Sequence, residues 1–474
     1  MNSSPRLLRL ADADGRRLLA TAILGSGMVF LDGTIATVAL PRIGAELGGD
    51  LAALQWVING YTLGLAAFII VGGSLGDRFG RRRMYGAGVA SFAVASVVVA
   101  LSPTIGSLVA ARLLQGVAAA LLTPGSLSML QASFHPEDRM RAIGAWSGTL
   151  GITTAAGPIV GGALVGIDWR LGFWINVPIA LVVLWLLRAA PESSDPQASR
   201  RMDLPGLALA PAALAGITWA LTDWPSTSAR IAGAAGLIAA AAFVVVELRS
   251  RHPMVPPSLF SDRVFTGINV ATLVVYGAFA ASQFFLTLFL QVAAGWTPLQ
   301  AGAAGVPVSL FMLVLSARFG AYATRHGPRA PMVVGMLLVA VGFALLSRAP
   351  LEPSYPVHLL PGILVQGLGM SMLVAPLTGS VLAAVPEGRA GIASGINNAV
   401  SRSGGLISIA ALPLLVGLSG TAYRDAIDVA GAYSAAMLWC VALMAAGALV
   451  AALTLGPGSG ASPTARTGQA GPGG

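Results

Sequence analysis

Long apolar segments constrain this chain more than any other feature. Of its 474 residues, 55% are hydrophobic and only 10% are charged, a balance that a soluble protein of this size does not have. A helix that crosses a bilayer needs about 20 apolar residues. Windows of that kind fall near 18–40, 53–75, 84–102, 105–130, 142–167, 172–188, 204–222, 231–248, 266–291, 300–318, 331–347, 356–383, 391–416 and 431–455. The sequence therefore predicts an all-α polytopic membrane protein with 14 transmembrane helices.

The positive charge follows the predicted topology. Lysine is absent, so the 28 basic residues are all arginine. When the loops alternate between sides, 21 arginines fall on the side of both termini and 5 on the other, with Arg112 and Arg402 inside the membrane. Because positive loops stay in the cytoplasm, we expect both termini to be cytoplasmic and no nucleic acid to bind. The arginine-, alanine- and glycine-rich composition favours a bacterial cytoplasmic membrane.

Residues that carry covalent or metal chemistry are scarce. Cys440 is the single cysteine and lies in an apolar window, and the four histidines fall in loops or helix ends. Disulfides and a cysteine-rich metal site are therefore excluded, and no nucleotide-binding loop or nucleophile with an adjacent base is present. We expect no enzyme activity, no metal and no cofactor, so a proton gradient is the expected energy source.

Two stretches about 250 residues apart read alike, as in transporters built from two related halves. The segment 113–124 resembles 364–376, and the loop 73–83 resembles 320–329. This repeat divides the chain into a disordered cytoplasmic tail, a six-helix half, cytoplasmic linkers with two inserted helices, a second six-helix half and a second disordered cytoplasmic tail. The corresponding boundaries are 1–14, 15–190, 191–263, 264–455 and 456–474.

One acidic residue, Asp32, lies deep inside an apolar window. A charged side chain at a helix centre costs about 3 kcal/mol or more, so such a residue usually binds something, and a proton is the simplest candidate. Arg112 lies at a similar level, since both residues are roughly 10–12 Å from the outer ends of their windows at a rise of 1.5 Å per residue. We predict that they approach each other, either as a proton-coupling pair or as a static ion pair.

The order of motifs resembles the major facilitator superfamily, and more narrowly its fourteen-helix drug:proton antiporter branch, over residues 15–455. The resemblance rests on Leu31 to Pro41, Gly73 to Arg83, Arg112 to Gly116, and Gly148 with Gly157 to Gly162; segments 168–178, 203–206 and 247–260 are secondary features. It implies the major facilitator fold, with two central helices inserted between the six-helix halves. It also implies that Arg112 serves proton coupling.

The resemblance assigns two structural devices. An antiporter bend that seals the interior would comprise Gly148, Gly157, Pro158, Gly161 and Gly162, although ordinary close packing of a glycine-rich helix is the alternative. A conformational latch between the second and third helices would comprise Gly73, Asp77, Arg78, Gly80 and Arg81. For its arginines, a positive loop that only sets topology is the alternative.

Polar residues inside the remaining windows are candidates for a substrate cavity: Gln115, Gln283, Gln366, Asn397, Asn398 and Arg402. The glutamines could instead bridge helices. Arg402 could bind an anionic group, pair with Asp32 in one conformation, or satisfy carbonyls at a helix break.

The sequence predicts a proton-coupled antiporter that exports small amphipathic drugs or antibiotics by alternating access, working as a monomer in the lipid bilayer. Proton-coupled solute uptake is the alternative, and a receptor or a membrane-embedded enzyme is a more distant one.

Overall fold

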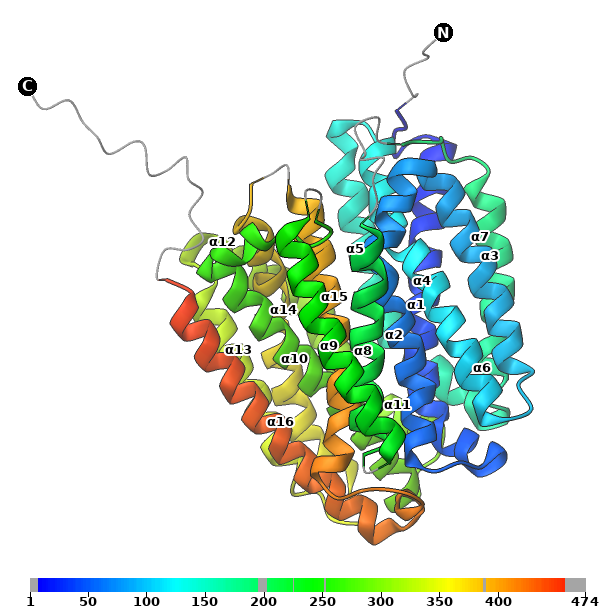
Figure 1. The fold of residues 1–474 in the computed structure, drawn as a ribbon, viewed down its shortest axis with the longest axis vertical. Coiled ribbons are helices and arrows are strands. Elements are labelled where there is room, and N and C mark those ends of the chain that lie inside the picture. The colour runs from blue at the N-terminus through cyan, green and yellow to red at the C-terminus, as the bar shows by residue number, and fades with distance from the viewer. Residues whose placement is uncertain (1–6, 195–202, 225, 251–252, 387–388, 457–474) are drawn as a thin grey trace, which may run out of the picture.

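A computed structural model describes residues 7–194, 203–224, 226–250, 253–386 and 389–456. These residues form a helical bundle, and within them one isolated β-bridge joins Leu8 to Phe134. The bundle has two helical halves with an inserted helix pair between them (Figure 1). The N-terminal half comprises α1 (Ala13–Leu47), α2 (Leu51–Phe79), α3 (Arg81–Ala100), α4 (Ile105–Ser133), α5 (Pro136–Ile167), α6 (Leu171–Trp174) and α7 (Asn176–Leu187).

The inserted pair is α8 (Leu204–Thr222) and α9 (Thr227–Arg249). The C-terminal half comprises α10 (Arg263–Leu288), α11 (Pro298–Ala304), α12 (Val306–His326), α13 (Arg329–Leu346), α14 (Leu360–Ala383), α15 (Ala390–Leu415) and α16 (Ala426–Thr454). Short turns at Pro257–Ser261, Phe289–Ala293, Tyr355–Leu359 and Ala422–Arg424 complete the helical segments.

Among the described residues, 12 helical segments are long and apolar enough to cross a membrane. Two of the predicted spans are helical but do not belong to these twelve. The span at 172–188 corresponds to a shorter apolar stretch, Leu171–Leu187, which is broken into α6 and α7. The span at 391–416 corresponds to α15, which carries Arg402 and two asparagines. The multi-pass architecture is confirmed, while the count of fourteen crossings stays a prediction.

Glycines allow equivalent helices of the two halves to pack closely. A Cβ atom on Gly116 of α4 would lie 2.1 Å from the carbonyl oxygen of Tyr61 in α2. In the C-terminal half, a Cβ atom on Gly362 of α14 would lie 2.9 Å from the carbonyl oxygen of Gly342 in α13. Real Cβ atoms do not approach backbone this closely, so these positions need small residues. Both sites lie in helices that the internal repeat relates to each other.

The two ends of the bundle differ. The described chain begins at Leu7 and ends at Gly456 on the same side, which we call the terminal end (Figure 1). The hydrogen bonds that join the halves within the described residues lie at the opposite end, which we call the closed end. There the Gln55 amide donates to the carbonyl oxygens of Ile409 and Ala410 at 2.6 and 3.2 Å. The Leu51 amide donates to the Gly420 carbonyl oxygen at 2.9 Å.

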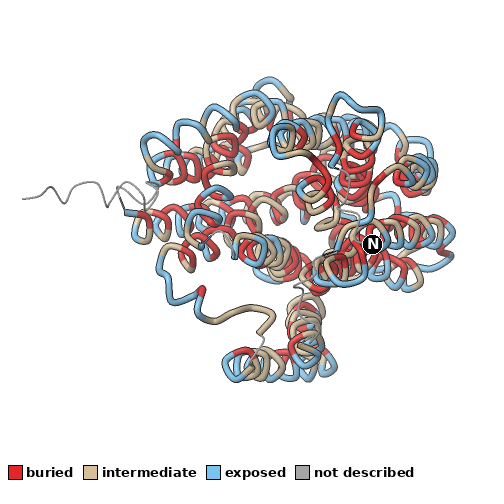
Figure 2. The backbone as a smooth tube through the Cα atoms, turned by 90° about the horizontal axis from the view of Figure 1, so that it is seen from above, coloured by how far each residue is buried: buried red, intermediate tan, exposed pale blue. Residues whose placement is uncertain are grey.

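The apolar core follows the same asymmetry. One large cluster of buried side chains runs from the C-terminal half into the closed end of the N-terminal half, and a smaller cluster fills the terminal end of the N-terminal half alone. Figure 2 shows the buried backbone turned inward in each group of helices and exposed backbone around them. Since apolar packing joins the halves at the closed end, that end is sealed.

The structure describes only part of the two predicted tails. The sequence predicts a disordered segment over residues 1–14, yet the Leu8 amide donates to the Ser133 carbonyl oxygen at 2.8 Å and the Leu8 carbonyl accepts from His135 at 3.0 Å. The helix α1 then begins at Ala13. Residues 1–6 and 457–474 lie outside the described residues, and so do residues 195–202 in the linker between α7 and α8.

Candidate functional site: a buried charge network in the N-terminal half

Asp32 lies in the middle of α1 and is completely buried. Its carboxylate accepts hydrogen bonds from three side chains. Oδ2 accepts from Arg112 Nη1, with which it also forms a salt bridge. Oδ1 accepts from Gln115 Nε2 at 2.7 Å and from Asn176 Nδ2 at 3.0 Å. The contact between Asp32 and Arg112 that depth along the two helices predicted is therefore confirmed.

Arg112 comes from α4 and is 1% exposed. Its Nε donates to the Val57 carbonyl oxygen of α2 at 3.1 Å, and Nη1 also donates to Gln115 Oε1 at 2.7 Å. The guanidinium lies over the rings of Tyr61 and Phe173, 4.4 and 5.5 Å from their centroids. Arginine suits this position because its planar group stacks on aromatic faces while its edge donates several directed hydrogen bonds. The pair is charged, paired and closed off from solvent.

Gln115 joins the two charged residues rather than lining a cavity. Its amide donates to Asp32 and to Ser96 Oγ, the latter at 2.9 Å, and its oxygen accepts from Arg112. Asn176 donates both to Asp32 and to Ser96 Oγ, at 3.2 Å for the latter. Five residues from α1, α3, α4 and α7 thus form one polar network. Sequence reasoning did not assign Ser96 or Asn176 to the site; the signal for Asn176 was a polar residue in the apolar run Phe173 to Pro178.

The bend residues of α5 pack against both halves near the closed end. A Cβ atom on Gly157 would lie 2.7 Å from Thr34 Oγ1 of α1, and one on Gly161 would lie 2.8 Å from Ile35 Cγ1. A Cβ atom on Gly162 would lie 2.6 Å from the Pro298 carbonyl oxygen of α11. In turn, a Cβ atom on Gly302 of α11 would lie 2.2 Å from the Pro158 carbonyl oxygen. These residues therefore allow backbone contact between the halves.

Gly148 behaves differently from the other bend residues. It lies in the exposed half of α5 toward the terminal end, and a Cβ atom there would meet nothing within 4 Å. In this conformation it takes no part in the contact between α5 and α11.

Among the described residues, the hydrogen bonds and ion pairs of the predicted latch lie within the N-terminal half and the segment that follows it. Asp77 forms a salt bridge with Arg81, with 2.7 Å between Oδ1 and Nη2. Gly80, at φ +104°, turns the chain between α2 and α3. The next residues are bound to the segment that follows α7, since the Arg82 amide donates to Glu192 Oε1 at 3.0 Å. Arg78 stacks on the neighbouring Phe79 ring, 4.9 Å from its centroid, and Gly73 approaches Pro124 of α4.

Asn397 and Asn398 lie beside a small cavity of about 80 Å³ between α10, α14 and α15. Its lining consists of Tyr276, Thr378, Val381, Leu382, Ser394, Asn397, Asn398 and Ser401. Asn397 donates to Asn269 Oδ1 at 3.2 Å and to Thr272 Oγ1 at 2.9 Å. Asn398 is exposed and donates to the Ser394 carbonyl oxygen at 3.1 Å. The polar side chains that line this cavity are neutral, while the charge of Arg402 on α15 acts on Tyr276 from nearby.

The other predicted cavity residues are dispersed. Arg402 is partly buried and lies over the Phe30 ring of α1, 5.9 Å from its centroid. Asp32 is paired with Arg112 and not with Arg402. Gln366 is buried in α14 against Gly342 of α13, and its Nε2 has no hydrogen-bond partner. Gln283 of α10 is partly buried near Gly305.

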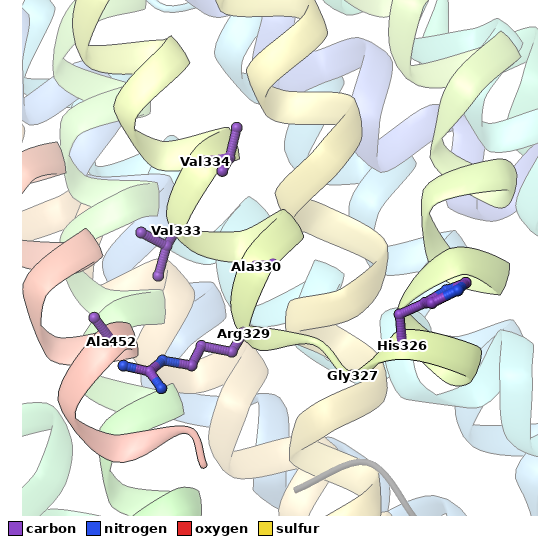
Figure 3. A pocket seen from close by; sticks show the side chains of 7 residues that line it. All are labelled: His326, Gly327, Arg329, Ala330, Val333, Val334 and Ala452. Atoms are coloured by element: carbon purple, nitrogen blue, oxygen red, sulfur yellow. The ribbon is translucent and has the colours of Figure 1, made fainter. Parts of the chain in front are cut away.

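A larger depression of about 400 Å³ opens where α12, α13 and α16 meet. Figure 3 shows its lining, with Arg329 directed toward Ala452 and His326 on the opposite side. No group of three or more metal-ligating side chains occurs among the described residues. The depression is far from the Asp32 network in sequence and belongs to different helices.

Comparison with known proteins identifies the chain's relatives. The model for the Major Facilitator Superfamily matches residues 22–409. The chain is 35% identical over 406 residues to the tetracenomycin C resistance and export protein of Streptomyces glaucescens, covering 84% of this chain and 75% of that protein. It is 34% identical over 440 residues to the cephamycin export protein CmcT of Amycolatopsis lactamdurans, covering 90% of each. Other relatives include the puromycin resistance protein pur8 of Streptomyces alboniger, at 34% identity over 400 residues that cover 81% of this chain and 78% of the relative.

Solved structures share the fold at low identity. A bacterial homolog of the human lysosomal transporter Spinster, in an inward-facing and unoccupied conformation, has a TM-score of 0.67 at 18% identity and covers 93% of this chain and 96% of its own. A peptide transporter POT in complex with sulfate has a TM-score of 0.67 at 16% identity, covering 93% and 95%. The family model spans most of the chain, and relatives above 30% identity align over most of both partners. The chain belongs to the major facilitator superfamily.

Proposed function

We propose that this protein is a proton-coupled antiporter that exports small amphipathic antibiotics from the cytoplasm by alternating access. The observation that carries the proposal is the buried network around Asp32, in which one carboxylate and one guanidinium are enclosed with three neutral hydrogen-bonding groups. A charge kept this deep in an apolar bundle is a functional feature in membrane proteins. Export follows the relatives, whose names describe resistance and export.

The ion pair suits a step in which Asp32 has released its proton. An ionised Asp32 neutralises Arg112, and both residues are buried in the conformation whose opposite end is sealed. Opening of the closed end would bring water to the pair, and protonation of Asp32 would remove the countercharge of Arg112. Proton binding and the change of conformation are therefore coupled through one contact.

The orientation in the membrane follows from the arginines. The loops and tails on the side of the chain ends, which include the loops between α2 and α3 and between α4 and α5, carry 21 of the 28 arginines. We therefore place the terminal end in the cytoplasm. This conformation then opens to the cytoplasm, where an exporter takes up its substrate.

The substrate would meet unlike surfaces in the two halves. The C-terminal half offers the neutral amides of Asn397 and Asn398 beside the small cavity, while Arg402 lies near Phe30 of α1. Hydroxyl, carbonyl and aromatic groups match these partners. We expect amphipathic, hydrogen-bonding aromatic compounds rather than polyvalent ions to be exported, by a monomer that needs no cofactor besides the proton gradient.

Inside-out vesicles test the function directly. In vesicles that are acidic inside, addition of a substrate such as tetracenomycin C, puromycin or a cephamycin should dissipate part of the pH gradient, because each imported substrate molecule releases protons outward. Vesicles without the protein provide the control. Accumulation of the same compounds by whole cells, with no response in the vesicles, would establish uptake and contradict export.

A further inference from the structure

The inserted helix pair carries two carboxyl groups that take no part in the proposed proton-coupled transport. Asp203 precedes the first residue of α8, and Glu247 lies in the last turn of α9. Glu247 is 4% exposed. Asp203 Oδ2 and Glu247 Oε1 are both buried and lack a hydrogen-bond partner. Two orphaned acceptor atoms of this kind are costly in an apolar environment.

The two orphaned oxygens face each other. A Cβ atom on Gly206 would lie 2.8 Å from Asp203 Oδ2 and also 2.8 Å from Glu247 Oε1, so both atoms converge above this glycine. The carboxyl groups are within hydrogen-bonding reach of each other. If both were ionised, two negative charges would lie together with no donor between them. One proton removes this conflict, since a protonated Glu247 donates to Asp203 and satisfies both atoms at once.

The helix ends decide which residue holds the proton. Asp203 Oδ1 accepts from the Gly206 amide at 3.0 Å at the N-terminus of α8, where the helix dipole stabilises a negative charge. Glu247 lies at the C-terminal end of α9, where the dipole disfavours one. Glu247 Oε2 already accepts from the Val255 amide at 3.0 Å, which leaves Oε1 to carry the hydrogen. Among the described residues, Asp203 is the one charged group that interacts electrostatically with Glu247. No charged residue of α2 or α15 does so.

We propose that Asp203 and Glu247 form a second proton-binding site, in which a proton on Glu247 Oε1 is donated to the Asp203 carboxylate. The site joins the start of α8, the end of α9 and the segment that leads to α10. Helix α8 packs against α2 of one half and α15 of the other. The proton therefore stabilises the inserted pair where it bridges the two halves. This inference does not rest on the proposed transport function.

Infrared spectroscopy of the purified full-length protein tests the proposal. All variants are made in an Asp32→Asn background, which removes the other buried carboxyl group. The parent should show the carbonyl band of a protonated carboxylic acid, which disappears as the pH is raised. Glu247→Gln should lose this band, whereas Glu352→Gln, at an exposed loop position, should keep it. Asp203→Asn should shift the band, because the charged acceptor is replaced by a neutral amide.

Thermal unfolding provides a second readout that guards against misfolding. In Glu247→Gln, the new side-chain amide can donate to Asp203 while its oxygen accepts from Val255, so this variant reproduces the protonated state and should fold. The parent should lose stability as the pH rises, because the state with the proton bound is the stable one, and Glu247→Gln should lose much less. An identical carboxylic acid band in the parent and Glu247→Gln would overturn the proposal. So would a stability that responds to sodium or potassium but not to pH.

Discussion

The two halves of the molecule are related by an internal repeat but differ in the charges they bury. The N-terminal half encloses Asp32 and Arg112 in a network that is fully hydrogen-bonded around the carboxylate. At the repeat position of Arg112 the C-terminal half has Ile363, which is buried and apolar. Its buried polar cluster, formed by Asn269, Thr272 and Asn397, is neutral. We therefore propose that proton chemistry and substrate recognition are divided between two copies of one scaffold.

Asp32→Asn should cause the largest loss of proton-coupled export. The amide cannot bind a transferable proton and leaves Arg112 buried without a countercharge, a loss that costs about 3–5 kcal/mol when a buried pair is broken. We expect proton-coupled export to fall to the level of vesicles without the protein. Binding of a fluorescent substrate to the purified variant, measured beside transport, separates lost coupling from lost folding. Normal coupled export by this variant would place the proton site elsewhere.

Arg112→Lys should be nearly as damaging. Lysine keeps the charge but cannot bridge Val57, Gln115 and Asp32 with a planar group. We expect export to fall at least about tenfold, equivalent to about 1.4 kcal/mol, and its pH optimum to move. A pH profile of transport by the variant measures both changes. An unchanged profile would mean that Arg112 only supports packing, as a static ion pair would.

Gly302→Leu tests the contact that seals the closed end. The new side chain cannot fit against the Pro158 carbonyl oxygen, which would lie 2.2 Å from a Cβ atom. We expect the closed end to open more often, so that a cysteine at Gln55 in a Cys440→Ser background reacts faster with a membrane-impermeant thiol reagent. Gly148→Leu is the matched control, since Gly148 has open space around it. Equal labelling of the two variants would show that the α5 and α11 contact does not control access.

Asn397→Ala should have the smallest and most selective effect. It removes two neutral hydrogen bonds, each of which contributes about 1 kcal/mol, from the C-terminal half. We expect export of some compounds to change by several fold, with proton coupling retained for the rest. Susceptibility of a pump-deficient host to a panel of antibiotics measures the change. A uniform loss of proton coupling for all compounds would contradict separate roles of the two halves.

Sequence reasoning predicted the helical architecture well because long apolar windows and arginine placement depend on the bilayer, not on tertiary detail. It also predicted that Asp32 and Arg112 approach each other. The depth of a residue follows from its distance along the helix, and both residues lie at a similar depth. It did not find Ser96 or Asn176, since small polar residues in apolar helices carry no distinctive spacing. Gln115 was assigned to a cavity because only its orientation in the folded bundle shows that it binds Asp32.

The latch residues show a second limit of the sequence. The resemblance predicts that Asp77 holds a closed conformation, but Asp77 pairs with Arg81 one helical turn away. A local partner satisfies the carboxylate in this conformation, and a single sequence does not tell which conformational state a contact belongs to. The role of Asp77 in the alternative conformation stays a prediction.

Substrate-driven proton movement in reconstituted proteoliposomes tests whether the two halves divide proton binding and substrate recognition between them. Wild type, Asp32→Asn and Asn397→Ala are compared with one exported compound and an entrapped pH indicator. If the halves divide these roles, the wild type exchanges protons and Asp32→Asn does not. Asn397→Ala still exchanges protons, but the exchange depends more weakly on substrate concentration. Proton exchange by Asp32→Asn at the wild-type level would contradict it.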